Sequence, residues 1–485
     1  MASSTRNIDA TEGSLATKSL QIAWPAVLQA ILVNFYAFND FFFIGLLGDE
    51  AATAALSACF AIIVVNYTLL RVISTGATTL VSQYFGQKEP DRLAEVLRQA
   101  LSAELIWSVL VGFGGLAALP FIVDVANATP AVGARIDAYL RIFYWTAPFY
   151  GLVLVVIGAF RACGNTQVPL VIEIGSLVLN ALLNYLLVLG AGPIPSMGIS
   201  GAAIATAVSR AVPGIVGLVL ILRGHLDIDL GSLVDDAAAW QPRMSRVRSM
   251  FRIGLFSSLS GMLYGVVFFI LNRMAGEIGP AAQGGLGAGL RGIEWIGYAF
   301  GDGFMTATMA VVGQNIGAGK VDRAVRGAWI NAAMSAASCQ LVGLLFLAAP
   351  LTLSGIVTDD PATLAHAAEY VGIIGWVMWA VGLEMSTYGA LIGTGRTHVS
   401  LIVSGGMNVL RIPIAAALLF GTTALPAGVA WSVGLAAEPP TVTGGFTAIA
   451  YTIAATAVIK ACIFAVYSAT RLGSAERVAQ AQQTS

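Results

Sequence analysis

Six acidic residues lie inside strongly apolar stretches of the sequence: Asp40, Glu104, Glu173, Glu294, Asp302 and Glu384. A charged group costs at least about 2.5–3.5 kcal/mol to insert at the centre of a hydrocarbon layer, so a residue of this kind is a candidate functional residue. The alternative is a side chain that reaches the interface or pairs with a neighbour. Carboxylate oxygens bind Na⁺, and a buried acid can carry a proton. We therefore expect reversible binding of small cations at some of these positions.

One set of polar residues shares a helix face. Glu173, Asn180 and Asn184 are spaced by seven and four residues, and at 100° per residue they fall within a stripe of about 40° over a rise of roughly 16 Å. We expect this stripe to line a cavity in the first half of the chain. The alternative places Glu173 at the interface and uses the asparagines to join helices.

A second stripe occupies a helix expected over 282–315. It contains Arg291, Tyr298 and Asp302, and Glu294 follows Arg291 by three residues. We predict that this stripe and Glu294 serve gating or substrate selection. A structural pair between Arg291 and Glu294 is an equally open interpretation.

Three further predictions concern charged and aromatic side chains. Glu384 is placed to meet a cationic substrate or a proton, with Arg411 or Lys460 as its structural alternative partner. Glu104 and Arg141 could pair with each other. Tyr67, with other aromatic residues, could offer a cation–π surface, although aromatic residues in membrane helices more often serve packing.

The elements that must hold these residues are membrane helices. Of the 485 residues, 57% are hydrophobic and 11% are charged, against about a quarter charged in a soluble protein. This composition excludes a soluble enzyme, a disordered chain and a nucleic-acid binder. Three histidines and four cysteines lack the spacing of metal ligands. Twelve apolar segments are long enough to span a bilayer: 20–47, 52–84, 95–118, 137–160, 168–190, 198–222, 250–275, 282–315, 326–350, 369–393, 398–420 and 445–468.

Basic residues set the expected orientation. Most Lys and Arg lie in the even-numbered connections and the termini, whereas the odd-numbered connections hold only Arg135 and Arg273. Basic loops face the cytoplasm, so we expect both termini there, in a multi-pass protein of the cytoplasmic (inner) membrane. The polar stretch 224–249 divides the helices six and six. We expect a tail over 1–18, an N-lobe over 19–223, a linker over 224–249, a C-lobe over 250–470 and a tail over 471–485.

The two halves repeat each other. An offset of 231 residues aligns them without a gap from about residue 45 to 169, and Tyr139, for example, meets Tyr370. An insertion over about 421–444 follows in the second half, after which ATAVSR (205–210) matches ATAVIK (455–460). Arg71 and Asp302 occupy equivalent positions, so we predict a salt bridge between the lobes that breaks on opening.

Parallel repeats with even helix numbers indicate two pseudo-symmetric lobes that rock around a central cleft, the design of a secondary transporter. Nothing resembles the selectivity filter of a channel. The Gly-rich loop GxxxxGK[ST] of an ATPase does not occur. We therefore expect transport to be driven by an ion gradient, without a cofactor.

Several motifs carry a family resemblance: VSQYFGQKEPDRL (81–93), VVGQNIGAGKVDRA (311–324), FRACGNTQVP (160–169), IGTGRTHVS (392–400), MGISGAAIAT (197–206), GLRGIE (289–294) and LRIP (410–413). Together they make the chain similar to the multidrug and toxic compound extrusion (MATE) family, over roughly residues 18–470. The resemblance implies a monomeric antiporter that takes up Na⁺ or H⁺ and exports small organic, often cationic, compounds.

The resemblance also assigns residues. The helix-1 aspartate that commonly takes part in coupling in this family corresponds to Asp40. On helix 5 the family has an asparagine followed four residues later by an aspartate, whereas this chain has Asn180 and Asn184. The second carboxylate is thus missing, and Glu173 is a candidate to replace it. Asp40, Asn180 and Asn184 are also the candidate Na⁺ ligands. A helix-7 acid found in many bacterial relatives is absent.

Two alternatives to drug export stay open. One is a flippase for lipid-linked sugars, which would need a strongly basic cavity, whereas the intramembrane charges here are of both signs. The other is a membrane receptor that keeps the fold without transport, which the buried acids disfavour.

Overall fold

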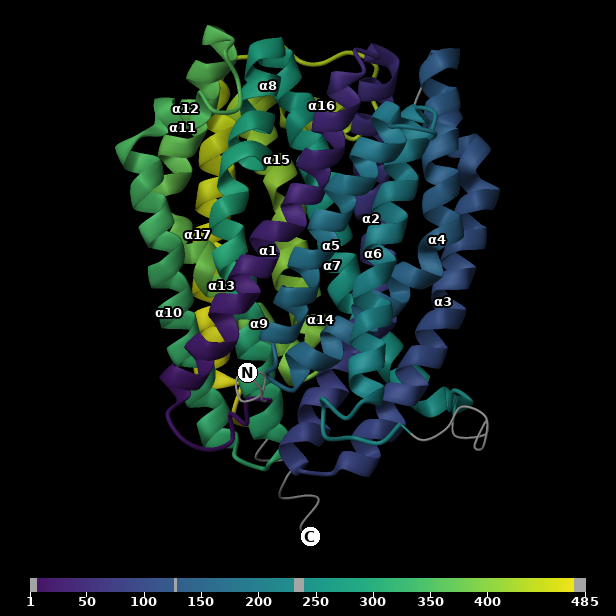
Figure 1. Ribbon diagram of the computed structural model, residues 1–485. Helices are drawn as coiled ribbons and strands as arrows, with labels where there is room; N and C mark the ends of the chain where they lie inside the picture. The colour runs from purple at the N-terminus through teal and green to yellow at the C-terminus, as the bar shows by residue number, and fades with distance from the viewer. Residues whose placement is uncertain (1–6, 126–128, 231–239, 475–485) are drawn as a thin grey trace. The chain divides into compact units, whose positions relative to one another are not determined.

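The regular elements of the protein are helices (Figure 1), as the continuous apolar segments predict. The computed structural model describes residues 7–125, 129–230 and 240–474. The predicted linker over 224–249 and the two predicted tails fall partly outside these ranges.

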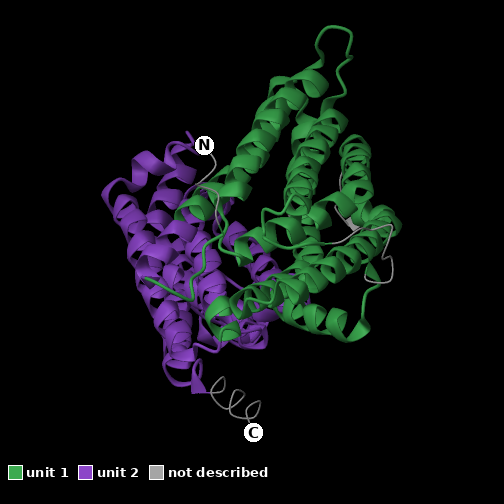
Figure 2. Cartoon of the chain, turned by 60° about the horizontal axis from the view of Figure 1, so that its bottom comes forward, with its two compact units in different colours: residues 1–13, 24–258, 313–318 green, residues 14–23, 259–312, 319–485 purple. Residues whose placement is uncertain are grey.

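The chain divides into two compact units (Figure 2). Unit 1 comprises Met1–Gly13, Trp24–Ser258 and Gly313–Ala318, and unit 2 comprises Ser14–Ala23, Leu259–Val312 and Gly319–Ser485. Three helices contribute to both units: α1 (Leu15–Leu46), α7 (Met244–Ile278) and α9 (Trp295–Gly317).

Unit 1 is built around α4 (Pro130–Ala162), which packs against α2 (Glu50–Gln87), α3 (Pro90–Val125) and α6 (Gly198–Leu222). Asp49 caps α2 by accepting a hydrogen bond from the Ala52 amide at 3.1 Å, and its carboxylate also pairs with Arg135 of α4. The Arg135 guanidinium beside Asp49 lowers the pKa of that carboxyl below its usual range. The other elements of this unit are α5 (Gln167–Asn184) and the π-helix η1 (Tyr185–Gly190).

Unit 2 repeats this arrangement with more breaks. Between α7 and α9 lie α8 (Pro280–Gly287) and the π-helix η3 (Ala288–Glu294). The later elements are α10 (Val321–Ala348), α11 (Pro350–Ser354), α12 (Pro361–Gly375), α13 (Met378–Gly393), α14 (Thr397–Ser400), the π-helix η4 (Leu401–Gly405), α15 (Gly406–Phe420), η5 (Thr422–Ala424), α16 (Leu425–Ser432) and α17 (Phe446–Thr470). The insertion seen in the sequence over 421–444 therefore contains two short helices.

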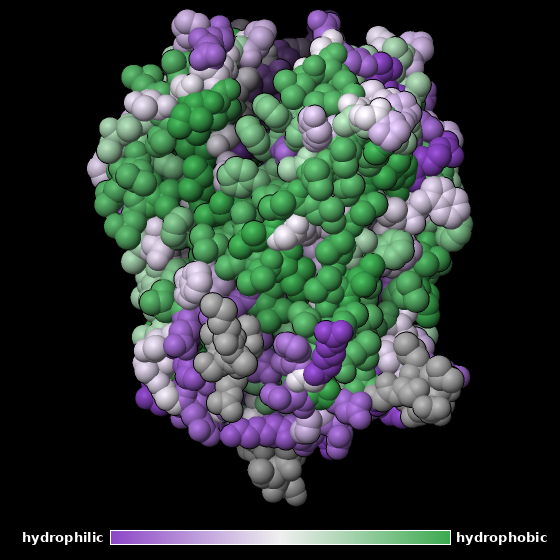
Figure 3. Space-filling view, viewed as in Figure 1, coloured by the Kyte–Doolittle hydropathy of each residue, from purple (hydrophilic) through white to green (hydrophobic). Residues whose placement is uncertain are grey.

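The helices have the length and composition of membrane spans. Among the described residues, ten helices are long and apolar enough to cross a bilayer, and the pair α12 and α13, bent by 64°, makes an eleventh. The remaining predicted span, 282–315, corresponds to α8, η3 and α9, which follow one another without a gap. Over the face shown in Figure 3, hydrophobic residues cover the middle of the helices and hydrophilic residues gather near their ends. The predicted polytopic all-helical fold is confirmed.

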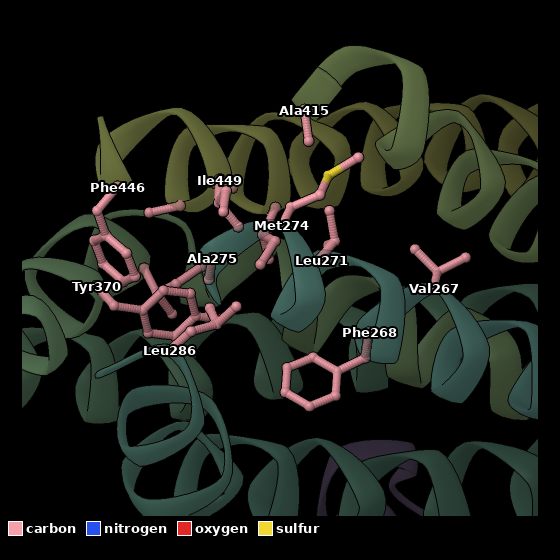
Figure 4. Packing of buried hydrophobic residues seen from close by; sticks show 14 of the residues in the cluster. Val267, Phe268, Leu271, Met274, Ala275, Leu286, Tyr370, Ala415, Phe446 and Ile449 are labelled. Carbon is pink, nitrogen blue, oxygen red and sulfur yellow. The ribbon is translucent and has the colours of Figure 1, made fainter. Parts of the chain in front are cut away.

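Each unit has its own apolar packing. In unit 2, side chains from α7, α8, α12, α15 and α17 interdigitate (Figure 4), among them Leu271, Met274, Leu286 and Ile449. The buried Tyr370 of α12 lies in this cluster with its ring against Gly289, where a Cβ atom would approach the ring to 2.6 Å. The missing side chain at Gly289 therefore lets the tyrosine pack against η3.

One helix crossing in unit 1, that of α2 and α9, depends on two glycines. A Cβ atom on Gly86 of α2 would overlap the carbonyl oxygen of Gln314 in α9, and one on Gly317 would overlap that of Gln83. Gly86 and Gly317 are equivalent in the repeat, as are Gln83 and Gln314. Small residues allow such close approach of helix backbones within membranes, so α2 and α9 are in contact through a symmetric pair of positions.

Candidate functional site

Asp40 of α1 is buried, with 4% of its surface exposed, among hydrogen-bond donors. The Asn184 amide donates to Oδ1 at 2.7 Å, and the Thr206 hydroxyl donates to Oδ2 at 2.7 Å. The Tyr139 hydroxyl lies 3.5 Å from Oδ2. Among the described residues, no basic side chain forms an ion pair with Asp40. The carboxylate is therefore held by neutral donors from α4, α5 and α6.

Asn180 extends this arrangement. Its carbonyl oxygen accepts from the Asn39 amide at 2.8 Å, and its own amide donates to the Thr206 hydroxyl at 3.2 Å. The side-chain oxygen of Asn184 is buried without a hydrogen-bond partner among the described residues. We call Asp40, Tyr139, Asn180, Asn184 and Thr206 the Asp40 network.

The local fold explains how these groups meet. α5 ends at Asn184, and the π-helix η1 begins at the next residue. Asn180 and Asn184 stand one helical turn apart on α5, on the face that packs against α6, which carries Thr206. The sequence prediction that places Asn180 and Asn184 on one face with Asp40 nearby agrees with this geometry.

Glu173, the third member of the predicted stripe, has a different environment. It forms an ion pair with Arg210 of α6 at 3.2 Å, and the Gln29 amide lies 3.5 Å from its other oxygen. The guanidinium of Arg210 lies 3.7 Å from the ring centroid of Tyr36. No hydrogen bond among the described residues joins Glu173 to Asp40. The structure thus does not bring Glu173 into the Asp40 network as a replacement for the missing aspartate.

Other predictions for unit 1 have mixed outcomes. The suggested pair of Glu104 with Arg141 is wrong, because Arg141 pairs with Asp137 at 2.7 Å, one turn away on α4. Both oxygens of Glu104 are buried without a hydrogen-bond partner in the described part of the chain. Tyr67 packs edge-on against Tyr150, with ring centroids 5.5 Å apart.

In unit 2, Glu384 pairs with Lys460. The Lys460 ammonium lies 2.8 Å from one oxygen of Glu384 and 2.9 Å from the other, and the Ser404 hydroxyl donates at 2.9 Å. Of the two partners expected from the sequence, Lys460 is thus the one observed. Arg411 instead donates from Nε to the Thr456 hydroxyl at 2.8 Å.

Glu294 is a second acid of this unit and is buried, with 2% of its surface exposed. Its Oε2 accepts a hydrogen bond from the Tyr370 hydroxyl at 2.6 Å. The alternative pairing with Arg291 is wrong, because the Arg291 guanidinium lies 5.0 Å from the ring centroid of Phe268. η3, which ends at Glu294, breaks the regular helical register between the two residues.

Two residues of the stripe predicted over 282–315 do not take part in the contact between Glu294 and Tyr370. Tyr298 is partly buried and packs against the apolar cluster of unit 2, and Asp302 is partly buried. The salt bridge predicted between Arg71 and Asp302 would join the two units, so it stays a prediction.

Three important partners were missed from the sequence: Tyr139, Thr206 and Tyr370. Each lies in a segment that the repeat aligns. Tyr139 is equivalent to Tyr370, and Thr206 is equivalent to Thr456 through the ATAVSR and ATAVIK match. Polar residues kept in both copies of the repeat were therefore the signal that could have identified them.

The polar atoms around Asp40 also fit Na⁺. The oxygen donors available are both carboxylate oxygens of Asp40 and the side-chain oxygens of Asn180, Asn184 and Thr206, and oxygen is the ligand that hard cations prefer. Among the described residues, no group of three or more His, Cys, Asp or Glu side chains gathers as a site for a metal ion.

Comparisons with known proteins identify the family. The family model described as MatE matches residues 25–186 and 257–417, which together make more than half of the chain. The chain is 25% identical over 401 residues to the FAD transporter of Shewanella oneidensis, covering 82% of this chain and 86% of that protein. It is 23% identical over 416 residues to the multidrug export protein MepA of Staphylococcus saprophyticus, covering 85% and 88%.

Solved structures show the same fold. An outward-facing multidrug resistance MATE transporter of the MOP superfamily is similar with a TM-score of 0.82 and 17% identity, covering 96% of this chain and 98% of that one. A MOP superfamily transporter from Pyrococcus furiosus is similar with a TM-score of 0.83 and 17% identity, covering 98% and 99%. The chain therefore belongs to the multidrug and toxic compound extrusion (MATE) family of multi-pass membrane transporters, whose members are not enzymes.

Proposed function

We propose that this protein exports small organic compounds from the cytoplasm in exchange for H⁺ or Na⁺, and that Asp40 binds the coupling cation. The observation that carries the proposal is that Asp40 is buried among neutral donors without an ion pair in the described part of the chain. A permanently paired acid has no free charge to offer a cation, whereas the carboxylate of Asp40 keeps its charge available.

The acids in the apolar segments differ in whether a basic side chain pairs with them. Glu173 is neutralised by Arg210 and Glu384 by Lys460. Breaking such a pair leaves an uncompensated buried charge at a cost of about 3–5 kcal/mol, so these two carboxylates are poor exchangers of a cation. Asp40 carries no such constraint, which favours it over Glu173 as the coupling residue.

The partners of Asp40 suit a proton. Hydroxyl groups can both donate and accept, and an asparagine amide offers a donor or an acceptor according to its orientation. Thr206, Tyr139 and Asn184 donate to the ionised carboxylate as observed. When Asp40 is protonated, the unpartnered oxygen of Asn184 can accept a hydrogen bond from the carboxyl group after an amide rotation. Both protonation states are therefore satisfied with small movements.

The same geometry supports competition between substrate and cation. An organic cation that comes close to Asp40 interacts favourably with the carboxylate only when the coupling cation has left. Each ligand then lowers the affinity for the other by the same factor, which is the thermodynamic requirement for exchange.

The proposal includes the arrangement in the membrane. The basic loops favour cytoplasmic termini in the cytoplasmic membrane, with two lobes over 19–223 and 250–470, acting as a monomer. Lipids surround the helices, and no nucleic-acid partner is proposed.

A second candidate is export of an organic anion. Arg411 of α15 is buried and forms no ion pair among the described residues, so it could receive an anionic group. A relative at 25% identity is named an FAD transporter. An anion that pairs with Arg411 would not compete at Asp40.

The test is transport into everted membrane vesicles that contain the wild type, Asp40→Asn, or the matched control Asp137→Asn. A pH gradient and a Na⁺ gradient are imposed separately, with ethidium as the cationic probe and FAD as the anionic one. We expect one gradient to drive ethidium uptake in the wild type and the control, with a loss of at least about tenfold in Asp40→Asn. Uptake that is unchanged in Asp40→Asn would overturn the proposal, and uptake of FAD alone would establish the second candidate.

A further inference from the structure

We propose that Glu294 and Tyr370 form a second proton-binding site, in unit 2, that works alongside Asp40 in the same transport cycle. The coupling role rests on the proposed function, whereas proton binding at Glu294 does not.

The first argument is the state of the acid. Glu294 is 2% exposed, and its one hydrogen bond within the described residues comes from the Tyr370 hydroxyl at 2.6 Å. Glu384 of the same unit, which is partly buried, has an ammonium at 2.8 Å. Glu294 is therefore a buried acid that can change its charge without leaving a basic side chain unpaired among the described residues.

The second argument comes from the internal repeat. Tyr370 is equivalent to Tyr139, and the Tyr139 hydroxyl lies 3.5 Å from Asp40. Both tyrosines point a phenol at a buried acid, yet the acids come from different helices, α1 in one unit and η3 in the other. Extending the repeat register by five residues places Leu271 at the position of Asp40. Unit 2 thus keeps the tyrosine and supplies the carboxyl group from another element.

The surroundings of Glu294 allow both charge states. Burial favours the neutral form of an acid, and a nearby cation favours the carboxylate. Arg411 of α15 and Lys460 of α17 are the cations of this region. Tyr264 of α7, Tyr298 of α9 and Glu384 of α13 are the other titratable groups in this region. The Tyr370 phenol donates to the carboxylate and can accept from the acid, so the contact between the two groups can persist in both charge states.

The oxygen count favours a proton over Na⁺ at this site. Glu294 and Tyr370 offer three oxygen atoms, fewer than the six or more that alkali-sized cations collect. Two basic side chains in the same region repel a metal cation. A proton needs only one acceptor and one partner for the hydroxyl that it creates.

The backbone around Glu294 is irregular in a way that suits a moving part. η3 is a π-helical segment that ends at this residue, and such segments occur frequently at functional sites. The ring of Tyr370 packs on Gly289 within the same segment. A shift of the π-helical register would therefore move the carboxyl group relative to the phenol, and would couple protonation to the shape of this helix.

Infrared spectroscopy of the purified protein in liposomes tests proton binding directly. Difference spectra between acidic and basic pH report the C=O stretch of each carboxyl group that gains a proton. We expect Glu294→Gln to remove one titrating band that Asp40→Asn leaves in place. Tyr370→Phe should keep that band but shift its frequency, because the phenol no longer contacts the acid. A wild-type set of titrating bands in Glu294→Gln would overturn the inference.

Coupling is measured in proteoliposomes as the number of protons exchanged per tetraphenylphosphonium ion. We expect two in the wild type and one in Glu294→Gln. Two in both proteins would remove Glu294 from the cycle while leaving Asp40 as the coupling residue. Transport that survives in Asp40→Asn would instead defeat the proposed function, and the infrared band would still decide whether Glu294 binds a proton.

Discussion

Glu104 and Glu173 are buried to nearly the same degree in unit 1, with 1% and 2% of their surface exposed, but their partners differ. Glu173 is paired with Arg210, whereas neither oxygen of Glu104 has a hydrogen-bond partner among the described residues. Glu104 lies against Gly151 of α4, where a Cβ atom would come within 3.0 Å of its carboxyl oxygen. A buried polar group without a partner costs stability, and a buried pair resists removal of either member.

We predict opposite effects of one substitution at these two positions. Glu104→Met replaces the carboxyl-bearing side chain by an apolar side chain that is also unbranched. It should raise the free energy of unfolding by about 1–3 kcal/mol. Glu173→Met leaves the largely buried Arg210 without its acid and should lower the free energy of unfolding by about 3–5 kcal/mol. The melting temperatures of both variants in detergent provide the measurement. A lower melting temperature for Glu104→Met would show that its carboxyl group has a stabilising partner.

At the scale of elements, the π-helical segments lie beside the polar residues of the site. η1 begins immediately after Asn184, η3 ends at Glu294, and η4 contains Ser404, which donates to Glu384. A π-turn changes which residues share a helix face, so hydrophobic periodicity gives no sign of it. This is why the sequence predicts an Arg291 to Glu294 pair that the structure replaces with a Tyr370 contact. The α5 stripe could be predicted because Asn180 and Asn184 precede the irregular segment.

The crossing of α2 and α9 leads to a second prediction. Gly317→Ala adds a methyl group where the backbone of α2 already lies, so α2 and α9 must separate. We expect at least a tenfold loss of ethidium transport and a lower melting temperature. Gly175→Ala on α5 is the matched control, because nothing lies within 4 Å of its new Cβ atom. Equal behaviour of the two variants would mean that the crossing tolerates separation.

At the scale of the whole molecule, the repeat preserves contacts but exchanges charges. The amide of Asn180 donates to Thr206, and at the equivalent positions Arg411 donates to Thr456. Arg210 and Lys460 are equivalent cations, and each is paired with an acid inside an apolar segment. Those acids are not equivalent: the position of Glu173 holds Ser404 in unit 2, and Ser404 donates to the displaced acid Glu384.

This exchange of charges between the repeats explains how much of the site could be predicted from the sequence. Apolar length predicted the helices, and constant register predicted the repeat, since both depend on the chain order alone. The choice of Lys460 over Arg411 as the partner of Glu384 required the distances between α13, α15 and α17. The sequence could name Glu173 as a spare carboxylate, but it could not show that Arg210 of α6 already neutralises that group.

Glu294 forms no ion pair among the described residues, and this bears on the source of energy for transport. If Asp40 and Glu294 each bring a proton inward for one monovalent organic cation moved outward, each cycle transfers one net positive charge. The membrane potential then contributes about 2.3 kcal/mol per 100 mV. We predict that a potassium diffusion potential of about 100 mV, imposed with valinomycin at equal pH, drives export by the wild type and not by the electroneutral Glu294→Gln variant. An exporter built in this way would continue to work in a neutral medium, where voltage is the larger part of the proton-motive force.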